Sequence, residues 1–370
     1  SGPNLSGNEL KYVKDCIDTG WVSSVGSYVT DFENKISNFV GSKYAVATSS
    51  GTTALHLSLL LSKIEKDDYV IVPNVTFIAT LNAIKYVGAN PILIDIDVNT
   101  WQMDLNLLEE FLNTNTILKD ERTFYKNKPI KAIMPVHVLG NICDMKKLID
   151  ISSKHNLDII EDAAESLGSK YFDKHSGTFG KMGCFSFNGN KIITCGGGGV
   201  IVTNDEKIAH KAKHLSTQAK ADSFEYYHDD IGFNYRLTNV SAAIGLAQME
   251  QLPKFINRKH EIKEFYFSEL SNVGDIEFQK VDKNVFSNWW LFTIRTKFQQ
   301  KLLKKLNQNK FQSRPFWIPM NQLPMFKDDI YISQNNFSEM IYKSCLSIPC
   351  STNISDSEIK SVINCIKSEF

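Results

Sequence analysis

Two kinds of apolar pattern alternate between residues 43 and 205 of the chain. Short runs of consecutive Val, Ile and other apolar residues predict strands at 44–47, 69–72, 92–95, 132–136, 157–160, 184–187 and 200–203. Longer stretches between them predict helices at 52–62, 77–87, 104–112 and 145–155. This alternation indicates an α/β domain around a mostly parallel sheet. Because the strands are continuously apolar, we expect the sheet to be covered on both faces.

The pattern changes after Thr238. A long helical stretch extends from about Asn239 to Leu270, and we expect an interruption near Pro253 because proline disfavours helix interiors. Shorter and more polar segments follow. We therefore predict a large domain at residues 1–252 and a smaller C-terminal α/β domain at residues 253–370.

Composition and charge exclude several classes of function. The 370 residues include 41 Lys+Arg and 41 Asp+Glu, so the net charge is zero and favours neither nucleic acid nor an anionic membrane. No apolar stretch is long enough to span a bilayer, and no basic-then-apolar leader opens the sequence, so we expect no signal peptide. The seven scattered cysteines predict reduced thiols in a cytoplasmic protein. The eight histidines include no HExxH, and we expect no metal site.

Residues 49–55 (SSGTTAL) join a predicted strand to a predicted helix. The N–H groups and positive dipole at a helix N-terminus suit a phosphate, and the small Gly51 and the hydroxyl of Thr52 would allow close approach. An ordinary Ser/Thr helix cap would have the same sequence.

Acidic residues follow the strand predicted at 157–160. Ligands of open α/β sheets bind at the carboxyl ends of the strands, which is where Asp162 would lie. If the ligand contained a pyridine ring, Asp162 could pair with its protonated nitrogen, and Glu165 could face an oxygen on that ring. A solvated acidic loop is the alternative, and for Glu161 we expect that alternative.

Residues 185–191 (FSFNGNK) place Lys191 directly after a Gly/Asn turn and before the glycines at 196–199. A lysine at the ligand-binding edge can form an imine with a carbonyl cofactor. Ser186 could anchor a phosphate, and the glycines leave room for a ligand. Taken alone, a lysine such as Lys191 is more often a surface lysine.

Together these segments resemble the DegT-type family of pyridoxal 5'-phosphate (PLP) dependent nucleotide-sugar aminotransferases. The resemblance extends from Gly7 to about Pro349, and its most specific parts are residues 161–169 (EDAAESLGS), 177–180 (GTFG), 185–191, the glycine run and 232–252. It implies the fold type I aminotransferase architecture, with the large domain binding PLP. It also implies a homodimer with shared active sites.

The resemblance assigns roles residue by residue. Lys191 matches the Schiff-base lysine, which also acts as general base and acid, and Asp162 matches the aspartate at the pyridine nitrogen. Ser186 and the turn of Gly51 and Thr52 match the phosphate anchors. Phe77 matches the aromatic residue that stacks on the ring, and Asn234 matches a residue that reaches the phosphate of the neighbouring subunit. The chain departs from many members at two positions, where Glu165 replaces Gln or His and Asn321 replaces His.

One branch of the family resembles the chain further. Five segments, at residues 21–26, 161–168, 186–194, 214–220 and 313–315, are similar to aminotransferases of the legionaminic-acid pathway. This resemblance implies transfer of an amino group from glutamate to C4 of a UDP-linked 4-keto-6-deoxy-N-acetylhexosamine. Candidate substrate contacts are Trp21, in the resembled segment 21–26, and Arg236 and Arg314. The two arginines could bind the diphosphate of the sugar or the carboxylates of the donor, because guanidinium groups bind oxyanions bidentately. Purely structural roles for both arginines are the alternative.

Other functions stay open. One is amination at C3 of a dTDP-linked 3-keto-6-deoxyhexose. A PLP-dependent sugar dehydratase is disfavoured, because related dehydratases replace the Schiff-base lysine with histidine. The alternative from another class of function is a PLP-binding regulator or a non-catalytic sugar binder. Such a protein would not require Lys191, Asp162 and Ser186 together, so the presence of all three argues against it.

Overall fold

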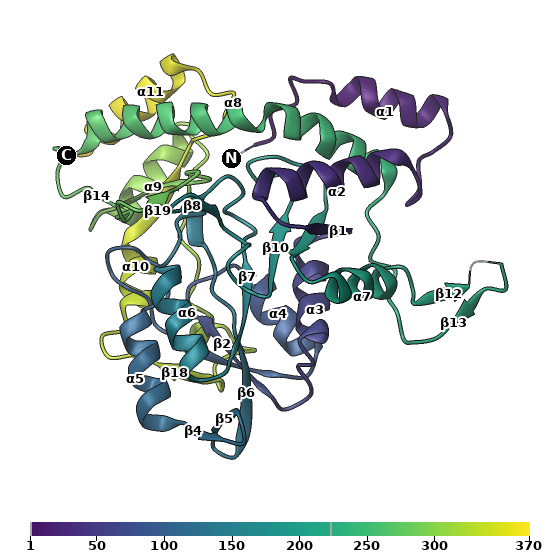
Figure 1. Cartoon of the computed structure of the whole chain (residues 1–370). Helices are drawn as coiled ribbons and strands as arrows, with labels where there is room; N and C mark the ends of the chain where they lie inside the picture. Colours follow the sequence, from purple (N-terminus) through teal and green to yellow (C-terminus); the bar gives the residue numbers. More distant parts are fainter. Residues whose placement is uncertain (1, 223) are drawn as a thin grey trace.

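A large central sheet organises the protein. The computed structural model describes residues 2–222 and 224–370. The strand order is β1 (Tyr44–Thr48), β11 (Gly199–Thr203), β10 (Met182–Ser186), β7 (Asp158–Asp162), β6 (Lys128–Ile133), β2 (Tyr69–Pro73), β3 (Asn90–Ile94) and β18 (Ile330–Ile332) (Figure 1). The strands from β10 to β18 pair in parallel, whereas β11 runs antiparallel to both of its neighbours. The predicted mostly parallel sheet is therefore confirmed.

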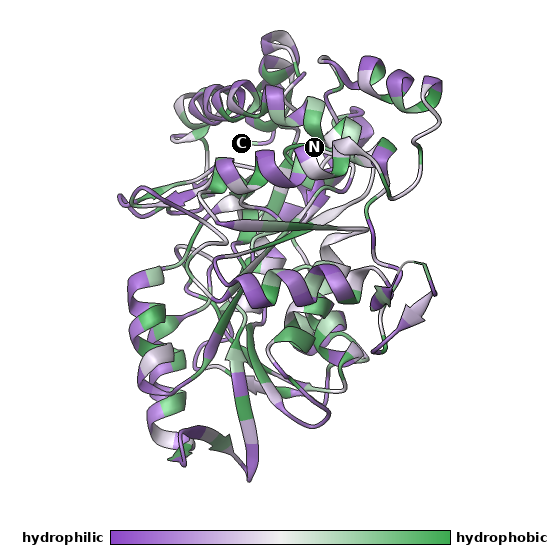
Figure 2. Cartoon of the chain, turned by 45° about the vertical axis from the view of Figure 1, so that its right-hand side comes forward, coloured by the Kyte–Doolittle hydropathy of each residue, from purple (hydrophilic) through white to green (hydrophobic). Residues whose placement is uncertain are grey.

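Helices cover both faces of this sheet. Helices α3 (Gly51–Leu61), α4 (Ala79–Tyr86) and α7 (Glu206–Ser216) lie on one side, and α5 (Leu105–Asn115) and α6 (Met145–Lys154) lie on the other (Figure 1). Side chains of β2 alternate between the two layers, since Val70 and Val72 belong to one buried cluster and Ile71 to the other. The strands are accordingly mostly green in Figure 2, whereas the helices also present purple, hydrophilic stripes. This explains why the strands read as continuous apolar runs.

Helix α8 (Asn239–Leu270) runs across the top of Figure 1 without a break. It contacts α1 (Glu9–Asp18) and α2 (Ser27–Val40) near its start and α11 (Asp356–Lys367) near its end. The expected interruption at Pro253 is wrong. Proline removes one helical hydrogen bond, but Leu252 and Phe255 beside it are buried in the core, and this packing keeps the helix continuous.

The C-terminal part has its own small sheet and its own core. The sheet order is β14 (Glu277–Phe278), β16 (Phe292–Arg295), β19 (Cys345–Ile348) and β17 (Arg314–Pro315). It packs with the end of α8, α9 (Gln299–Gln308) and α11 around a separate buried cluster. Helix α10 (Phe337–Ser344) and η2 (Met320–Gln322) complete this part, while β18 joins the large sheet. The division into domains at Pro253 stays a prediction.

Several short elements lie outside the main strand order of the large sheet and outside the small C-terminal sheet. They are the hairpin of β4 (Ile117–Lys119) and β5 (Arg122–Tyr125), η1 (Val138–Gly140), the sheet of β15 (Val285–Phe286), β8 (Lys170–Tyr171) and β9 (Lys174–His175), and the hairpin of β12 (Lys220–Asp222) and β13 (Tyr227–His228). Strand β6 begins earlier than predicted because β5 pairs with its first half. The β12–β13 hairpin extends away from the body at the right of Figure 1. No helix in the described ranges is both long and apolar enough to cross a membrane.

Candidate active site

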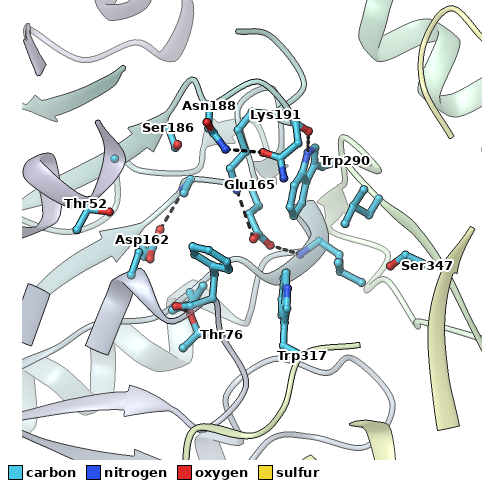
Figure 3. A pocket seen from close by; sticks show the side chains of 18 of the residues that line it. Thr52, Thr76, Asp162, Glu165, Ser186, Asn188, Lys191, Trp290, Trp317 and Ser347 are labelled. Atoms are coloured by element: carbon cyan, nitrogen blue, oxygen red, sulfur yellow. Dashed lines mark hydrogen bonds and ion pairs between the residues drawn. The ribbon is translucent and has the colours of Figure 1, made fainter. Parts of the chain in front are cut away.

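One cavity of about 560 Å³ lies where the carboxyl ends of β7 and β10 meet the first turn of α3. Eight of the residues predicted from the sequence line it, namely Gly51, Thr52, Phe77, Asp162, Glu165, Ser186, Lys191 and Arg314. The C-terminal part supplies the opposite wall. Figure 3 shows Thr52 and Asp162 on one side of the cavity and Trp290, Trp317 and Ser347 on the other.

Asp162 is the last residue of β7, and its carboxylate is buried. Thr80 Oγ1 donates a hydrogen bond of 2.7 Å to its Oδ2, and the Ala164 N–H donates one of 3.1 Å to its Oδ1. Burial raises the pKa of Asp162, while these two hydrogen bonds and the positive charge of Lys191 oppose the rise. A buried carboxylate in such a position would be stabilised by a cationic ligand.

Glu161 corrects an expectation from the sequence. It was expected in a solvated loop, but it is fully buried. Its carboxylate accepts backbone hydrogen bonds from Gly177, Phe179 and Gly180 at 2.7, 2.6 and 2.8 Å, and His137 Nε2 lies 2.9 Å from its Oε2. Strand alternation explains the difference, because Glu161 and Asp162 point to opposite faces of a sheet that is covered on both. Glu161 therefore organises the turn at 177–180 and does not line the cavity in the part of the chain that the structure describes.

Lys191 and Glu165 face each other inside the cavity. The turn that carries Lys191 is closed by its backbone N–H, which donates to the Asn188 carbonyl at 3.0 Å. Its Nζ lies 3.5 Å from Glu165 Oε1, the ion pair drawn as a dashed line in Figure 3, and the Leu139 N–H donates to Glu165 Oε2 at 2.8 Å. Burial raises the pKa of Glu165 to about 7, against the lowering effect of Lys191 and of the Leu139 N–H. Lys191 is thus a cavity lysine and not a surface lysine.

The first turn of α3 forms a polar end of the cavity. Ser50 caps this helix, since its hydroxyl accepts from the Thr53 N–H at 3.1 Å and Thr53 Oγ1 accepts from the Ser50 N–H at 3.0 Å. The next N–H groups, at Gly51 and Thr52, have no acceptor within the helix itself. A Cβ on Gly51 would lie 2.8 Å from Ser186 Cβ, so only glycine allows Ser186 to stand this close. The N-terminus of α3 and the hydroxyl of Ser186 together form a surface that is suited to a phosphate.

Phe77 lies in the loop between β2 and α4 and is 53% exposed. The same loop is held by a reciprocal amide pair. Asn74 Nδ2 donates to Asn321 Oδ1 at 2.9 Å, and the Asn321 N–H donates to Asn74 Oδ1 at 3.0 Å. Asn321, which replaces a histidine of the resembled family, therefore braces the loop that carries Phe77.

Sequence reasoning missed the aromatic wall of the cavity. Trp290 packs against Trp317 with a ring-centroid separation of 6.5 Å and an interplanar angle of 22°. Trp290 Nε1 donates to the Asn190 carbonyl at 2.7 Å, across 100 residues of sequence. No local pattern connects segments so far apart. The only signal in the sequence is the pair of adjacent tryptophans at 289 and 290.

Trp21, Asn234 and Arg236 do not line this cavity in the described ranges of the chain. Trp21 is 56% exposed, and its carbonyl accepts a 2.7 Å hydrogen bond from Asn239 at the start of α8. Asn234 is exposed, and Arg236 is partly buried. Their proposed contacts with substrate or with a second subunit stay predictions.

The cavity fits pyridoxal phosphate. The cofactor carries an anionic phosphate, a basic ring nitrogen and a reactive carbonyl carbon. The close approach of Gly51 at the start of α3 to Ser186 leaves a site that suits the phosphate. Buried Asp162 suits a protonated nitrogen, and Lys191 offers an amine in the same cavity. The three groups come from separate segments that the fold brings together.

Comparisons with known proteins agree with this geometry. The family model described as "DegT/DnrJ/EryC1/StrS aminotransferase family" matches residues 3–367. A protein of Escherichia coli O157:H7 named GDP-perosamine synthase is 42% identical over 329 residues, which cover 88% of this chain and 86% of that protein. A protein of the same name from Vibrio cholerae is 37% identical over 373 residues, covering 100% and 98% of the two chains. A solved DegT DnrJ EryC1 StrS aminotransferase from Brucella abortus superposes with a TM-score of 0.91 at 26% identity, covering 98% of this chain and 95% of that one.

Proposed function

Since this chain belongs to the DegT/DnrJ/EryC1/StrS aminotransferase family and is a PLP-dependent sugar aminotransferase, we propose that it transfers an amino group from glutamate to C4 of a nucleotide-linked 4-keto-6-deoxyhexose. The observation that carries the proposal is the meeting of Lys191, Asp162 and the first turn of α3 around one cavity. A cavity of about 560 Å³ has the size of a small-molecule site.

The side chains of this cavity take distinct roles in the proposal. When bound, pyridoxal phosphate supplies an electron-withdrawing ring that acidifies the C–H bond next to the amine nitrogen. Asp162 keeps the ring nitrogen protonated, because its buried carboxylate is stabilised by a cation. Lys191 would hold the cofactor covalently at rest, and its amine, once released by the incoming amino donor, would take the proton from that C–H bond and return it as general base and acid. Gly51, Thr52 and Ser186 anchor the phosphate, and Phe77 packs on the ring.

Two observations bear on the sugar and its nucleotide. Five segments of the sequence resemble the legionaminic-acid branch, which makes the UDP-linked 2-acetamido-4-keto-6-deoxyhexose the first candidate. Three relatives are named GDP-perosamine synthase, a GDP-sugar 4-aminotransferase activity, which makes a GDP-linked 4-keto-6-deoxyhexose the second candidate. Both candidates place the new amine at C4. Arg314 lines the cavity and is proposed to bind an oxyanion of the substrate.

A substrate panel tests this proposal. Purified enzyme with PLP and glutamate is offered UDP-, GDP- and dTDP-linked keto sugars, kcat/KM is measured for each, and the product is identified by NMR. We expect a clear preference for a 4-keto sugar and an amine at C4. Preference for a dTDP-linked 3-keto sugar would refute the site of amination. Amination of none of them, with PLP bound, would instead favour a regulator or a non-catalytic sugar binder.

We also propose a two-fold homodimer in which Asn234 reaches the phosphate of the partner's cofactor. Two observations support it. Asn234 is exposed and does not line the cavity of its own chain within the described residues. The projecting β12–β13 hairpin and the segment after it expose Tyr226, Tyr227 and Ile231, as expected of surface that a second subunit covers. The cytoplasmic location expected from the cysteine pattern stays a prediction.

A further inference from the structure

Trp290 contacts the segment of Lys191 in two ways. Lys191 Nζ lies 4.0 Å from the centroid of the Trp290 ring, which is the geometry of a cation–π interaction. Trp290 Nε1 also donates a 2.7 Å hydrogen bond to the carbonyl of Asn190, the residue just before the lysine. The indole thus fixes both the backbone that carries Lys191 and the charged end of its side chain.

Asn288 connects the two groups that flank the Lys191 amine. It is fully buried, and its Oδ1 accepts from the Trp290 N–H at 2.9 Å. Its Nδ2 donates to the carbonyls of Glu165 and Leu167, both at 2.9 Å. One amide therefore ties together the backbone segments that carry the Glu165 carboxylate and the Trp290 indole.

Trp290 is itself held from further directions. Lys259 Nζ donates to its carbonyl at 2.8 Å, and Trp317 packs against its ring. Only 2% of Trp290 is exposed. A ring fixed in this way can attract a cation without first losing conformational freedom of its own.

We propose that Trp290 is a positioning residue that holds the free amine of Lys191 beside Glu165 whenever Lys191 is not bonded to the cofactor. This inference rests on the role proposed above for Lys191. An aminotransferase lysine must release its bond and later form it again, and a free lysine side chain has about 2 kcal/mol of rotamer entropy. The ring and the carboxylate restrict that freedom and keep the amine inside the cavity.

The test measures how fast cofactor-free protein forms its covalent bond with added PLP, followed by the visible absorbance band. Only an unprotonated amine attacks the PLP carbonyl, so the expected effect comes from positioning by the ring and not from the cation–π energy itself. The ring restricts a side chain that has about 2 kcal/mol of rotamer entropy, so Trp290→Leu should slow bond formation about tenfold when each protein is measured at its own pH optimum. Trp290→Phe keeps a ring face but loses the bond to Asn190, and should slow it by a smaller factor. Trp289→Leu removes the adjacent buried indole, which faces the small-domain core, and should leave the rate within about twofold of wild type.

A second background separates positioning from direct contact with the cofactor. In Lys191→Ala protein, PLP binds only non-covalently, and adding Trp290→Leu should leave its dissociation constant unchanged. Three results would each overturn the inference. The first is a PLP affinity in the Lys191→Ala background that Trp290→Leu weakens about tenfold, and the second is a rate of bond formation that Trp290→Leu leaves unchanged. The third is a rate that Trp289→Leu lowers as much as Trp290→Leu does. If PLP bonds to another lysine in the wild-type protein, the proposed role of Lys191 fails first.

Discussion

The amine of Lys191 lies 3.5 Å from the carboxylate of Glu165 in the same cavity, where the Glu165 side chain is buried and that of Lys191 is only 10% exposed. Burial raises the pKa of Glu165 to about 7, and the nearby positive charge opposes this rise. Near neutral pH the carboxyl group is therefore balanced between its charged and protonated forms. A protonated Glu165 can donate a hydrogen bond to a ring oxygen, as Gln or His would in other members of the family.

The raised pKa predicts a pH-dependent effect of Glu165→Gln on stability. In the unfolded chain the pKa of Glu165 returns to about 4.5, so between pH 4.5 and 7 the folded state binds more protons. Stability contributed by this group falls as pH rises through that window. Cofactor-free Glu165→Gln should therefore gain stability relative to wild type between pH 5 and pH 8, by on the order of 3 kcal/mol at most.

Urea unfolding of both proteins at the two pH values measures this difference. Glu65 is exposed, so Glu65→Gln serves as a control and should show no comparable change. A stability difference between Glu165→Gln and wild type that does not vary with pH would contradict the raised pKa.

Glu161 and Asp162 are adjacent on β7, but replacing each by its amide should have a different effect, on protein stability for Glu161 and on PLP binding for Asp162. Glu161→Gln places an NH₂ group among backbone donors, and unsatisfied buried groups cost about 1–3 kcal/mol each. We expect it to lower the free energy of unfolding by about 3 kcal/mol. Asp162→Asn should leave the stability of cofactor-free protein within about 1 kcal/mol, because burial opposes its charge, but should weaken PLP binding about tenfold or more.

Urea unfolding and PLP titration separate these effects. The reverse pattern, with Asp162→Asn unfolding the protein and Glu161→Gln affecting only PLP binding, would show that the two roles are assigned wrongly.

Breaking the bond between Asn321 and Asn74 should loosen the loop of Phe77. We expect Asn321→Ala to lower stability by about 1–2 kcal/mol and to raise the KM for the keto sugar several-fold, because it removes the Oδ1 that accepts from Asn74 Nδ2, while the bond from the residue 321 N–H to Asn74 Oδ1 remains. Asn74→Ala removes this bond and also the one that the Asn321 N–H donates, so the effects of the two substitutions should not add. Strict additivity in steady-state kinetics and unfolding would show that the pair does not act as one unit.

The proposed action of Asn234 across a dimer predicts recovery of activity in mixed dimers. Lys191→Ala and Asn234→Ala proteins should each have low activity. After subunit exchange, a mixed dimer places both lesions in one site and leaves the other intact, so activity should rise toward a quarter of wild type in an equal statistical mixture. Exchange demonstrated by mass spectrometry without recovery would place the action of Asn234 within its own subunit.

The sequence predicts those parts of the site that depend on one segment at a time. Asp162 follows an apolar strand, Lys191 follows a Gly/Asn turn, and Gly51 opens a helix, so each is visible locally. Glu161 was misjudged because its partners lie at 177–180, in a turn that only the folded sheet brings beside it. The position of Trp290 over Lys191 depends on Asn288, which bonds to residues more than 100 positions away.

The fold could be predicted to a similar depth. Continuous apolar runs identified the strands of the large sheet, because burial on both faces leaves that direct signature. Strand β18 was missed, since its Ile330–Ile332 segment is short and pairs with β3 from far along the chain. The continuity of α8 through Pro253 was missed because tertiary packing outweighs the local effect of proline.

Lys191 is proposed to carry the cofactor, and one measurement tests this role most directly. The PLP-loaded enzyme is reduced with borohydride and digested, and the labelled peptide is sequenced by mass spectrometry. We predict a single pyridoxyl group on Lys191, and loss of both the label and the visible band in Lys191→Ala. A label on another lysine, such as the buried Lys259, or a visible band that persists in Lys191→Ala, would contradict the account.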